Sequence, residues 1–166
     1  MSDAIRDRVL QLFCCDFHEC YGTSEIAIAT NLNYQYAYVN SVGRAIHHVD
    51  VKIIGENRQL LNAGEEGEII CKTPMLFSGY YKKQCETKDS MHGEYFCTGD
   101  VGKLDENGYL TFLGRKKDII IVGGMNIYPK DIEDVILKHK SVSACSVIPI
   151  FDESLGEQIT AIVIPN

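Results

Sequence analysis

The sequence predicts an α+β fold, and two changes in its hydrophobic pattern support this assignment. Between residues 39 and 112, short apolar runs of β-like composition alternate with polar turn segments. After residue 115, a short apolar run is followed by an amphipathic segment and two further apolar runs, which gives a β-α-β-β order. We therefore expect two domains, residues 1–116 and residues 117–166, with a boundary near Arg115 to Asp118.

The first segment is predicted to be a short helix that Ser2 or Asp3 can cap. Its apolar residues follow the stripe of an amphipathic helix, so one face should pack on a sheet; they are Ile5, Val9, Leu12 and Phe13. The following stretch, CCDFHECYG, is expected to form a short strand that ends at Tyr21 and Gly22. Glycine at that point lets the backbone turn sharply or approach a ligand.

Four strands are predicted in the middle region, at residues 49–55, 67–73, 95–100 and 109–114. Polar turns are expected at 62–67 and at 105–108, where Asn-Gly suits the positive φ angles of a tight hairpin. Residues 78–94 are predicted to be a long polar connection, a kind of loop that is often functional.

The last region begins with a short buried strand at residues 118–124. Pro129 suits the first turn of a helix over 129–140, and strands are expected at 143–150 and 158–165. Asp118, Asp131, Glu133 and Asp134 resemble a carboxylate cluster, but a solvated helix face accounts for them better, with Asp131 favoured by the helix dipole. A self-contained domain seldom ends on a core strand, so the sequence is expected to be part of a longer chain.

Composition excludes several classes of function. The 166 residues are 45% hydrophobic and 23% charged, and no apolar run approaches the roughly 20 residues of a membrane span. The amino terminus lacks the pattern of a secretion signal, so a soluble cytoplasmic protein is expected. The net charge is −7, and the only clustered bases are at 115–117, which argues against a nucleic-acid partner.

Cysteine and histidine do not indicate a metal centre. The seven cysteines show no CxxC spacing, and we expect reduced, mostly buried thiols, although Cys14 and Cys15 leave a vicinal pair or a metal site open. His47 and His48 fall in a β-like run, which would direct their side chains to opposite faces.

Several short motifs are ambiguous when each is taken alone. YGTSEIA, residues 21–27, offers an aromatic ring, hydroxyl groups and a carboxylate suited to a magnesium-bound nucleotide, or it merely caps a following helix. Asp100 could accept hydrogen bonds from ribose hydroxyls or sit in an Asx turn. The guanidinium group of Arg115 could donate hydrogen bonds to the oxygen atoms of a ligand, or it could form an ion pair at the surface. Gly123 and Gly124 could form a simple turn, or they could let the backbone pass close to a substrate.

The order of these motifs is similar to that of the AMP-forming adenylating enzymes, which include acyl-CoA synthetases, luciferases and peptide-synthetase adenylation domains. The resemblance rests on YGTSE, on residues 93–134, and on the intervening SVGRAIHHVDVKII and AGEEGEIICKTPMLFSGYY. The form GGMNIYPKDIE resembles an acyl-CoA synthetase. The resemblance implies the β-barrel-like end of a large amino-terminal domain, followed by most of a small mobile α/β domain.

The resemblance also implies roles for individual residues. Tyr21, with Gly22, would lie against adenine, Ser24 would meet the α-phosphate where relatives more often have threonine, and Glu25 would bind magnesium. Asp100 and Arg115 would hold the ribose. Lys117 would be the hinge of the mobile domain. Gly123 and Gly124 would border the coenzyme A channel.

Two features of the family are expected to lie outside this sequence. Nothing before Tyr21 resembles the family's phosphate loop, and the catalytic lysine near the carboxyl terminus would fall beyond Asn166, so no catalytic residue is assigned within the chain. A lysine that some relatives place six residues after the arginine is Ile121 here. Adenylation needs positive charge where negative charge develops, so the isolated chain is expected to be inactive.

The sequence thus predicts part of an AMP-forming acyl-CoA synthetase that uses ATP, magnesium, coenzyme A and a carboxylic acid. Two alternatives stay open: an adenylation domain that loads a carrier protein, and a short non-catalytic binding module with this fold. The acid is not readable from the sequence, although Tyr34, Tyr36 and Tyr38 could line its pocket or simply pack in a strand.

Overall fold

The computed structural model describes residues 3–13, 15–33, 41–152, 154 and 156–166, and for residues 3–6 it describes the backbone alone. Tyr34, Tyr36, Tyr38, Cys14 and Ser2 lie outside the described residues. The chain divides into two compact units, which are Met1–Thr98 with Gly102–Phe112, and Gly99–Val101 with Leu113–Asn166. The α+β prediction is confirmed, since strands dominate both units and helices are few.

The first unit begins with helix α1 (Asp3–Phe13), followed by an antiparallel sheet in the order β1-β2-β3. Its strands are β1 (His18–Thr23), β2 (Ala27–Asn33) and β3 (Arg44–Ala45). Leu12 and Phe13 of α1 are 68% and 70% exposed, so the prediction that this stripe packs on a sheet is wrong for these two side chains. Neither β2 nor β3 was predicted.

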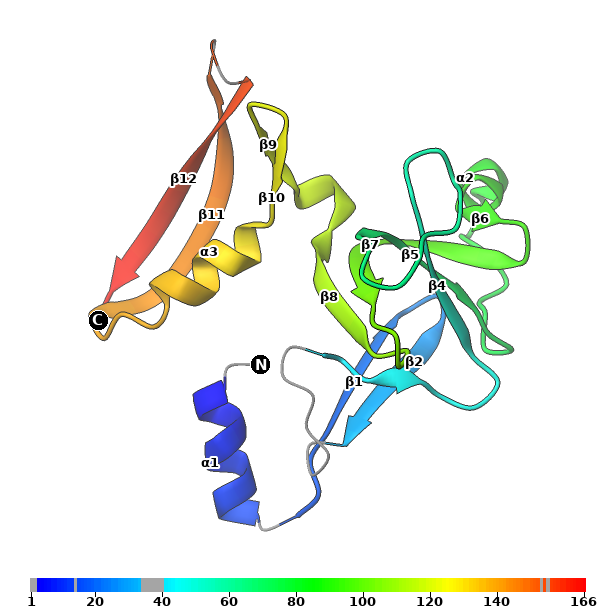
Figure 1. Cartoon of the computed structure of the whole chain (residues 1–166), viewed down its shortest axis with the longest axis horizontal. Helices are drawn as coiled ribbons and strands as arrows, with labels where there is room; N and C mark the ends of the chain where they lie inside the picture. Colours follow the sequence, from blue (N-terminus) through cyan, green and yellow to red (C-terminus); the bar gives the residue numbers. More distant parts are fainter. Residues whose placement is uncertain (1–2, 14, 34–40, 153, 155) are drawn as a thin grey trace. The chain divides into compact units, whose positions relative to one another are not determined.

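A larger sheet has the order β4-β5-β7-β6, with β8 paired to β7 (Figure 1), and it belongs to the first unit except for residues 99–101 and 113–115. Its strands are β4 (Asp50–Ile54), β5 (Gly67–Lys72), β6 (Met91–His92), β7 (Tyr95–Leu104) and β8 (Leu110–Arg115), and the sheet order does not close on itself within the described residues. The four predicted strands of this region are all present. Helix α2 (Gln84–Asp89) and strand β6 lie in the stretch that was predicted to be a polar connection.

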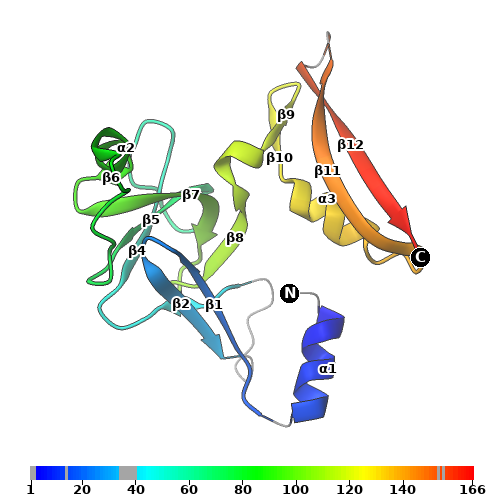
Figure 2. The ribbon, with the colours of Figure 1, turned by 180° about the vertical axis from the view of Figure 1, so that it is seen from behind.

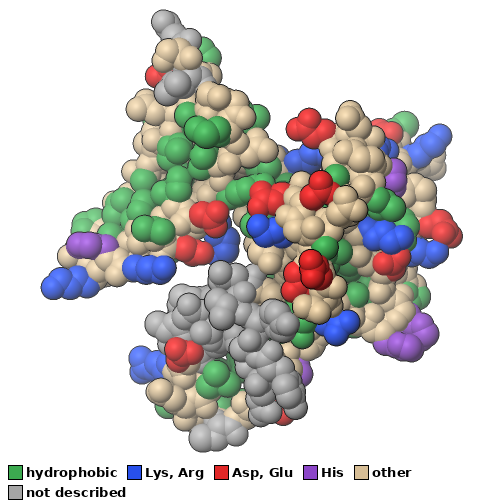
Figure 3. All heavy atoms as spheres, viewed as in Figure 1, with side chains coloured by type: hydrophobic (Ala, Val, Ile, Leu, Met, Phe, Trp, Pro, Cys, Tyr) green, Lys and Arg blue, Asp and Glu red, His purple; other side chains and the backbone are tan. Residues whose placement is uncertain are grey.

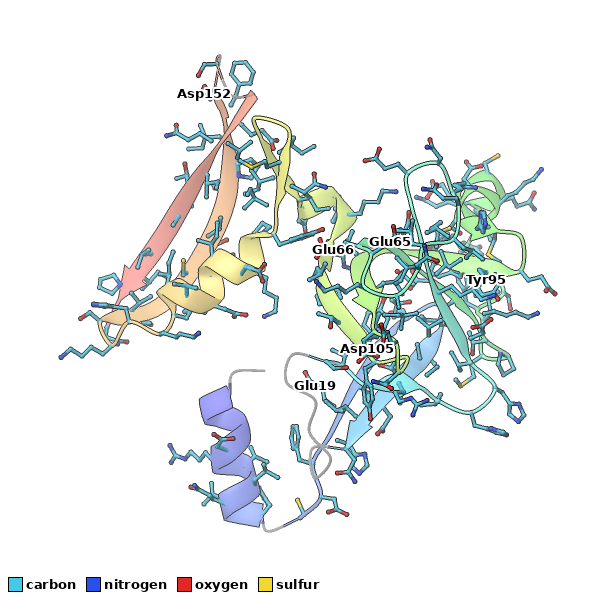
Figure 4. All side chains as sticks on the ribbon, viewed as in Figure 1. Glu19, Glu65, Glu66, Tyr95, Asp105 and Asp152 are labelled. Atoms are coloured by element: carbon cyan, nitrogen blue, oxygen red, sulfur yellow. The ribbon has the colours of Figure 1, made fainter. Side chains whose placement is uncertain are left out.

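Polar side chains fix the turns of this sheet (Figure 4). Between β4 and β5, the Asn62 backbone N–H donates to Glu65 Oε2 at 2.6 Å. Between β7 and β8, Asp105 Oδ1 accepts hydrogen bonds from the N–H groups of Asn107 (2.9 Å) and Tyr109 (2.8 Å). The predicted turn is present, but only Gly108 has a positive φ (78°) and Asn107 does not, so the expected pair of positive φ angles is wrong and Asp105 organises the segment as an Asx turn.

The core of the first unit joins residues from both of its sheets. Ile26 and Ala29 are fully buried in one cluster with Ile69, Phe96 and Leu110. Because β4 and β5 supply near-continuous apolar runs, both faces of these strands bury side chains. This core holds the turn after β1 against the larger sheet.

The second unit has a four-stranded sheet in the order β10-β9-β12-β11, and helix α3 lies along β11 (Figures 1 and 2). Its elements are a 3-10 turn (Lys116–Asp118), β9 (Ile120–Val122), β10 (Met125–Ile127), α3 (Pro129–Ile136), β11 (Val142–Asp152) and β12 (Gly156–Pro165). Pro129 begins the helix as predicted, but the helix ends at Ile136 rather than continuing to residue 140. β10 was not predicted.

Hydrophobic side chains remain exposed over the β10-β9-β12-β11 sheet of the second unit (Figure 3). Ile120 is fully buried and Val147 is 5% exposed, whereas Ile121 is 53% exposed. The prediction of a buried strand at residues 118–124 therefore holds for one face of β9 only.

Two further predictions from the sequence are wrong. Of the six described cysteines, all free, only Cys71 is buried, so the thiols are not mostly in the core. His47 and His48 lie in a turn with ring centroids 3.7 Å apart, not on opposite faces of a strand. A positive φ of 64° at His48 turns the backbone and brings the rings together.

Candidate nucleotide site

Tyr21 and Gly22 lie at a bulge where β1 runs antiparallel to β2. The register shifts between them, since Tyr21 pairs with Thr30 and Gly22 pairs with Ile28. A Cβ atom on Gly22 would lie 1.8 Å from the carbonyl oxygen of Ala27, so only glycine fits at this position. Tyr21 is 8% exposed, and the centroid of its ring lies 5.9 Å from that of Phe112.

A tight turn, not a helix, follows the bulge. The N–H of Ile26 donates to the carbonyl oxygen of Thr23 (3.3 Å), and the N–H of Glu25 donates to Thr23 Oγ1 (3.3 Å). Because β2 begins directly afterwards, the alternative that Thr23, Ser24 and Glu25 cap a helix is wrong. Ile26 is fully buried and anchors the turn, while Ser24 is exposed.

Glu25 is held by residues about fifty positions further along the chain. The hydroxyl of Tyr80 donates to Glu25 Oε1 at 2.9 Å, and the backbone N–H of Phe77 donates to the carbonyl oxygen of Glu25 at 2.8 Å. Burial, together with the hydrogen bond to Glu25, raises the pKa of Tyr80, so the phenol stays protonated as a donor. Sequence reasoning did not identify Tyr80, whose segment reads as a polar connection.

The Glu25 carboxylate suits magnesium in its chemistry. Mg²⁺ is usually bound by one or two carboxylates together with substrate phosphates and water, rather than by a cage of protein ligands. Glu25 offers hard oxygen atoms at a partly exposed turn. Across the part of the chain that the structure describes, there is no group of three or more His, Cys, Asp or Glu residues that could hold a metal ion alone. A single carboxylate that works with nucleotide phosphates fits this arrangement.

Asp100 and Arg115 form an ion pair in the second unit. Asp100 lies on β7 and is 2% exposed, and its Oδ1 is 3.0 Å from Nη1 of Arg115 at the end of β8. A buried carboxylate needs such compensation, because desolvation of an uncompensated charge is costly. In the same TGD motif, Thr98 has a structural role, since its hydroxyl donates to the carbonyl oxygen of Ile69 (2.8 Å).

Lys117 lies in the short 3-10 turn that follows Arg115. The residues on either side of this turn are extended, with φ and ψ of −85° and 137° at Arg115, and of −64° and 130° at Ile119. Lys117 itself is exposed. The turn therefore interrupts two extended segments at the position where the sequence predicts a hinge.

Gly123 and Gly124 form the two-residue turn between β9 and β10. Val122 pairs with Met125, and φ is 55° at Gly123 and 85° at Gly124, as a type I′ hairpin requires. The space around both glycines is open. In the adjacent strand, Ile121 donates its backbone N–H to Glu157 Oε2 (2.6 Å), which joins β9 to β12.

The structure thus places the predicted residues in two groups. Tyr21, Gly22, Ser24 and Glu25 share one strand end and turn of the first unit. In the second unit, Asp100 contacts Arg115, and the two glycines share the β9–β10 turn.

Comparison with known proteins identifies the family. The profile of the family described as AMP-binding enzyme matches residues 1–81. A 2-succinylbenzoate–CoA ligase of Bacillus cereus is 34% identical over 152 residues, which cover 90% of this chain and 31% of that ligase. The chain belongs to the AMP-binding enzymes. Another relative is the long-chain-fatty-acid–CoA ligase FadD13 of Mycobacterium tuberculosis, which is 40% identical over 126 residues, or 76% of this chain and 25% of that ligase.

Solved structures show the same fold in this family. ATP-bound MatB from Rhodopseudomonas palustris superposes with a TM-score of 0.83 at 37% identity, covering 90% of this chain and 30% of MatB. The o-succinylbenzoate CoA synthetase MenE from Bacillus subtilis, in complex with its acyl-adenylate intermediate, gives a TM-score of 0.90 at 27% identity. The match covers 98% of this chain and 34% of MenE. The chain spans about a quarter to a third of the length of these proteins.

The helices of the described residues include none that is long and apolar enough to span a bilayer. A further relative, from Mus musculus, is named as a mitochondrial medium-chain acyl-CoA ligase and is 34% identical over 149 residues, or 86% of this chain and 24% of that ligase.

Proposed function

We propose that the protein containing this chain is an AMP-forming acid–thiol ligase. In the first half-reaction, a carboxylate oxygen attacks the α-phosphorus of ATP, the bond to the bridging oxygen breaks, and pyrophosphate leaves. In the second, the coenzyme A thiol attacks the carbonyl carbon of the acyl-adenylate, AMP leaves, and the thiol proton is lost. The names of the relatives, which are CoA ligases for several acids, support coenzyme A as the acceptor.

In this proposal the first unit binds the adenine and phosphate end of ATP. Tyr21 and Gly22 border the base at the β1 bulge, Ser24 donates its hydroxyl to the α-phosphate, and Glu25 holds magnesium. Magnesium, when bound, neutralises phosphate charge. The exposed position of Ser24 and the partly exposed Glu25 carboxylate, both in one turn, are consistent with these roles.

The second unit contributes the ribose contacts and the moving parts. Asp100 accepts hydrogen bonds from the ribose hydroxyls, and Arg115 holds that carboxylate in place while donating to the ribose. Lys117 is the hinge about which residues 117–166 reorient between the half-reactions. Gly123 and Gly124 leave open backbone beside the coenzyme A channel.

The observation that carries the proposal is the buried Asp100 carboxylate compensated by Arg115. Replacing Asp100 with alanine in the native protein should weaken ATP and AMP binding by about 1.5–3 kcal/mol, because hydrogen bonds to a charged group are lost. Isothermal titration calorimetry measures this change, with the exposed Asp134→Asn as the matched control. Unchanged nucleotide affinity in a folded Asp100→Ala variant would remove Asp100 from the site.

The hinge is tested separately. Replacing Lys117 with proline fixes φ at that residue and should slow thioester formation more than adenylation. Pyrophosphate release and acyl-CoA production report the two half-reactions, and Lys116→Ala is the neighbouring control. Equal losses in both half-reactions would argue against a hinge at Lys117.

We also expect the isolated 166-residue chain to produce no AMP at an enzyme-like rate. The protein is expected to work in the cytoplasm.

A further inference from the structure

The contact between Tyr80 and Glu25 joins two segments of the first unit that are far apart in the sequence. The Tyr80 hydroxyl lies 2.9 Å from Glu25 Oε1, across 55 positions of the chain, and both side chains are partly buried. A hydrogen bond to a carboxylate is stronger than one between neutral groups. The contact therefore restricts the rotamers of a side chain that would otherwise be mobile at a partly exposed turn.

The Tyr80 ring is itself held in place by apolar packing. Its centroid lies 4.9 Å from that of Phe77 in an edge-to-face arrangement, and Phe77 makes the same kind of contact with Phe96 at 5.5 Å. Phe96 is 2% exposed and belongs to the core. The position of the hydroxyl is thus tied to the core of the unit through two aromatic rings.

The backbone at both ends of the contact is also fixed. The N–H of Tyr80 donates to Thr87 Oγ1 (2.9 Å), and the Thr87 hydroxyl donates to the carbonyl oxygen of Lys83 (2.9 Å), so α2 holds the segment that carries Tyr80. At the other end, the N–H of Phe77 holds the Glu25 carbonyl oxygen (2.8 Å). Donor and acceptor are therefore presented to each other by ordered backbone.

We propose that Tyr80 is a positioning residue whose hydroxyl orients the Glu25 carboxylate for the magnesium ion of Mg-ATP. This inference rests on the proposed function, which assigns Glu25 to the metal. A hydroxyl that donates to one carboxylate oxygen restricts the orientations in which the carboxylate can meet a metal. Residues that orient a metal ligand in this way typically change metal affinity by about 10- to 100-fold when they are removed.

The test is the magnesium dependence of nucleotide binding in the native protein. Binding of a non-hydrolysable ATP analogue is titrated at a series of Mg²⁺ concentrations and, separately, with EDTA. Tyr80→Phe keeps the ring and its packing, so we expect a rise of about 10-fold in the Mg²⁺ concentration that gives half of the metal-dependent gain in affinity. Affinity in EDTA should stay within about 2-fold of the wild type, since the lost contact acts through the metal.

Two further variants separate the possible outcomes. Tyr81→Phe removes the hydroxyl of the adjacent tyrosine, which is 85% exposed, and should leave the Mg²⁺ requirement unchanged. In a Glu25→Gln background, Tyr80→Phe should add no further shift, because both changes act on one ligand. Thermal unfolding confirms that each variant is folded.

A normal Mg²⁺ requirement in Tyr80→Phe, together with a raised one in Glu25→Gln, would overturn the role of Tyr80 and leave the proposed function standing. An unchanged requirement in Glu25→Gln would overturn the metal assignment itself, and the role of Tyr80 with it. Loss of affinity in EDTA would also overturn the inference, since it would mean that Tyr80 shapes the nucleotide pocket rather than the metal ligand.

Discussion

The strand pairs β4–β5 and β11–β12 have similarly apolar sequences, but the fraction of their apolar side chains that is buried is very different. In β4 and β5, Val51, Ile53, Ile54, Ile69 and Ile70 are each at most 7% exposed. In β11 and β12, Val147 is buried, while most of the other large apolar side chains are exposed, with Phe151 at 79% and Ile164 at 57%. An apolar strand therefore contributes to stability only where other elements of its unit cover it.

The largest difference between the two units should appear when a core isoleucine is shortened. Ile69→Ala removes a fully buried side chain from the first unit and should cost about 2–5 kcal/mol in the free energy of unfolding. Ile162→Ala in β12, where the side chain is 54% exposed, should cost about 1 kcal/mol or less. Urea denaturation of both variants provides the comparison. Similar losses would mean that β12 is covered in the protein that was measured.

The two glycine sites should also respond differently to an added methyl group. Gly22→Ala would place Cβ against the Ala27 carbonyl oxygen and should cost about 3 kcal/mol or more, because backbone must move. Gly123→Ala meets open space, so only its positive φ is unfavourable, at about 1–2 kcal/mol. Thermal unfolding measures both changes. A small effect at Gly22 would show that the β1 bulge can relax.

Alkaline pH should destabilise the first unit through Cys71. Burial first, and then the charge of Asp50, raise the pKa of this thiol from 9.0 to about 11. The unfolded thiol ionises at the lower pH, so the contribution of Cys71 to stability is complete below about pH 9 and is lost as the pH rises towards 11, with a slope of at most ~1.4 kcal/mol per pH unit.

Denaturation midpoints between pH 8 and 11 test this prediction. Cys71→Ala should show a shallower decline than the wild type, whereas Cys145→Ala in the second unit serves as the control for removal of a thiol. Parallel curves for the wild type and Cys71→Ala would contradict the prediction.

The smallest effects should be equal in the two units. Lys83 pairs with Glu86 in α2, and Lys130 pairs with Asp134 in α3, and all four side chains are more than half exposed. Solvent screens such pairs, so Lys83→Ala and Lys130→Ala should each cost about 0.5 kcal/mol or less. Salt dependence of the thermal midpoint checks the result. A clearly larger loss for either variant would indicate a more specific role for that lysine.

Several elements were predictable because their signals are local. Pro129 begins α3 since its ring suits the first turn of a helix, and Asp105 with Gly108 forms a turn from its own backbone and side-chain preferences. In contrast, α2 lies in a segment rich in charged and polar residues with no apolar stripe, and none of its residues is buried. Periodicity cannot identify a helix that has no buried face.

The candidate site was predictable in its residues but not in its contacts. The motifs indicated Tyr21, Glu25, Asp100 and Arg115 as a group through their order and spacing. Tyr80 was missed because no local pattern relates it to Glu25, 55 positions earlier in the chain. Only the packing of Phe77 and the hydrogen bonds around Thr87 bring its hydroxyl to that carboxylate.

The family, the strand-rich α+β class and the positions where glycine or proline is required could be predicted from the sequence, since each depends on residue order or on local backbone geometry. Three features became known only from the folded structure: which apolar strands are buried, that β2 follows the Glu25 turn, and that Asp100 is paired with Arg115. Burial and long-range hydrogen bonds depend on which segments meet in space, and residue periodicity carries no information about that partner.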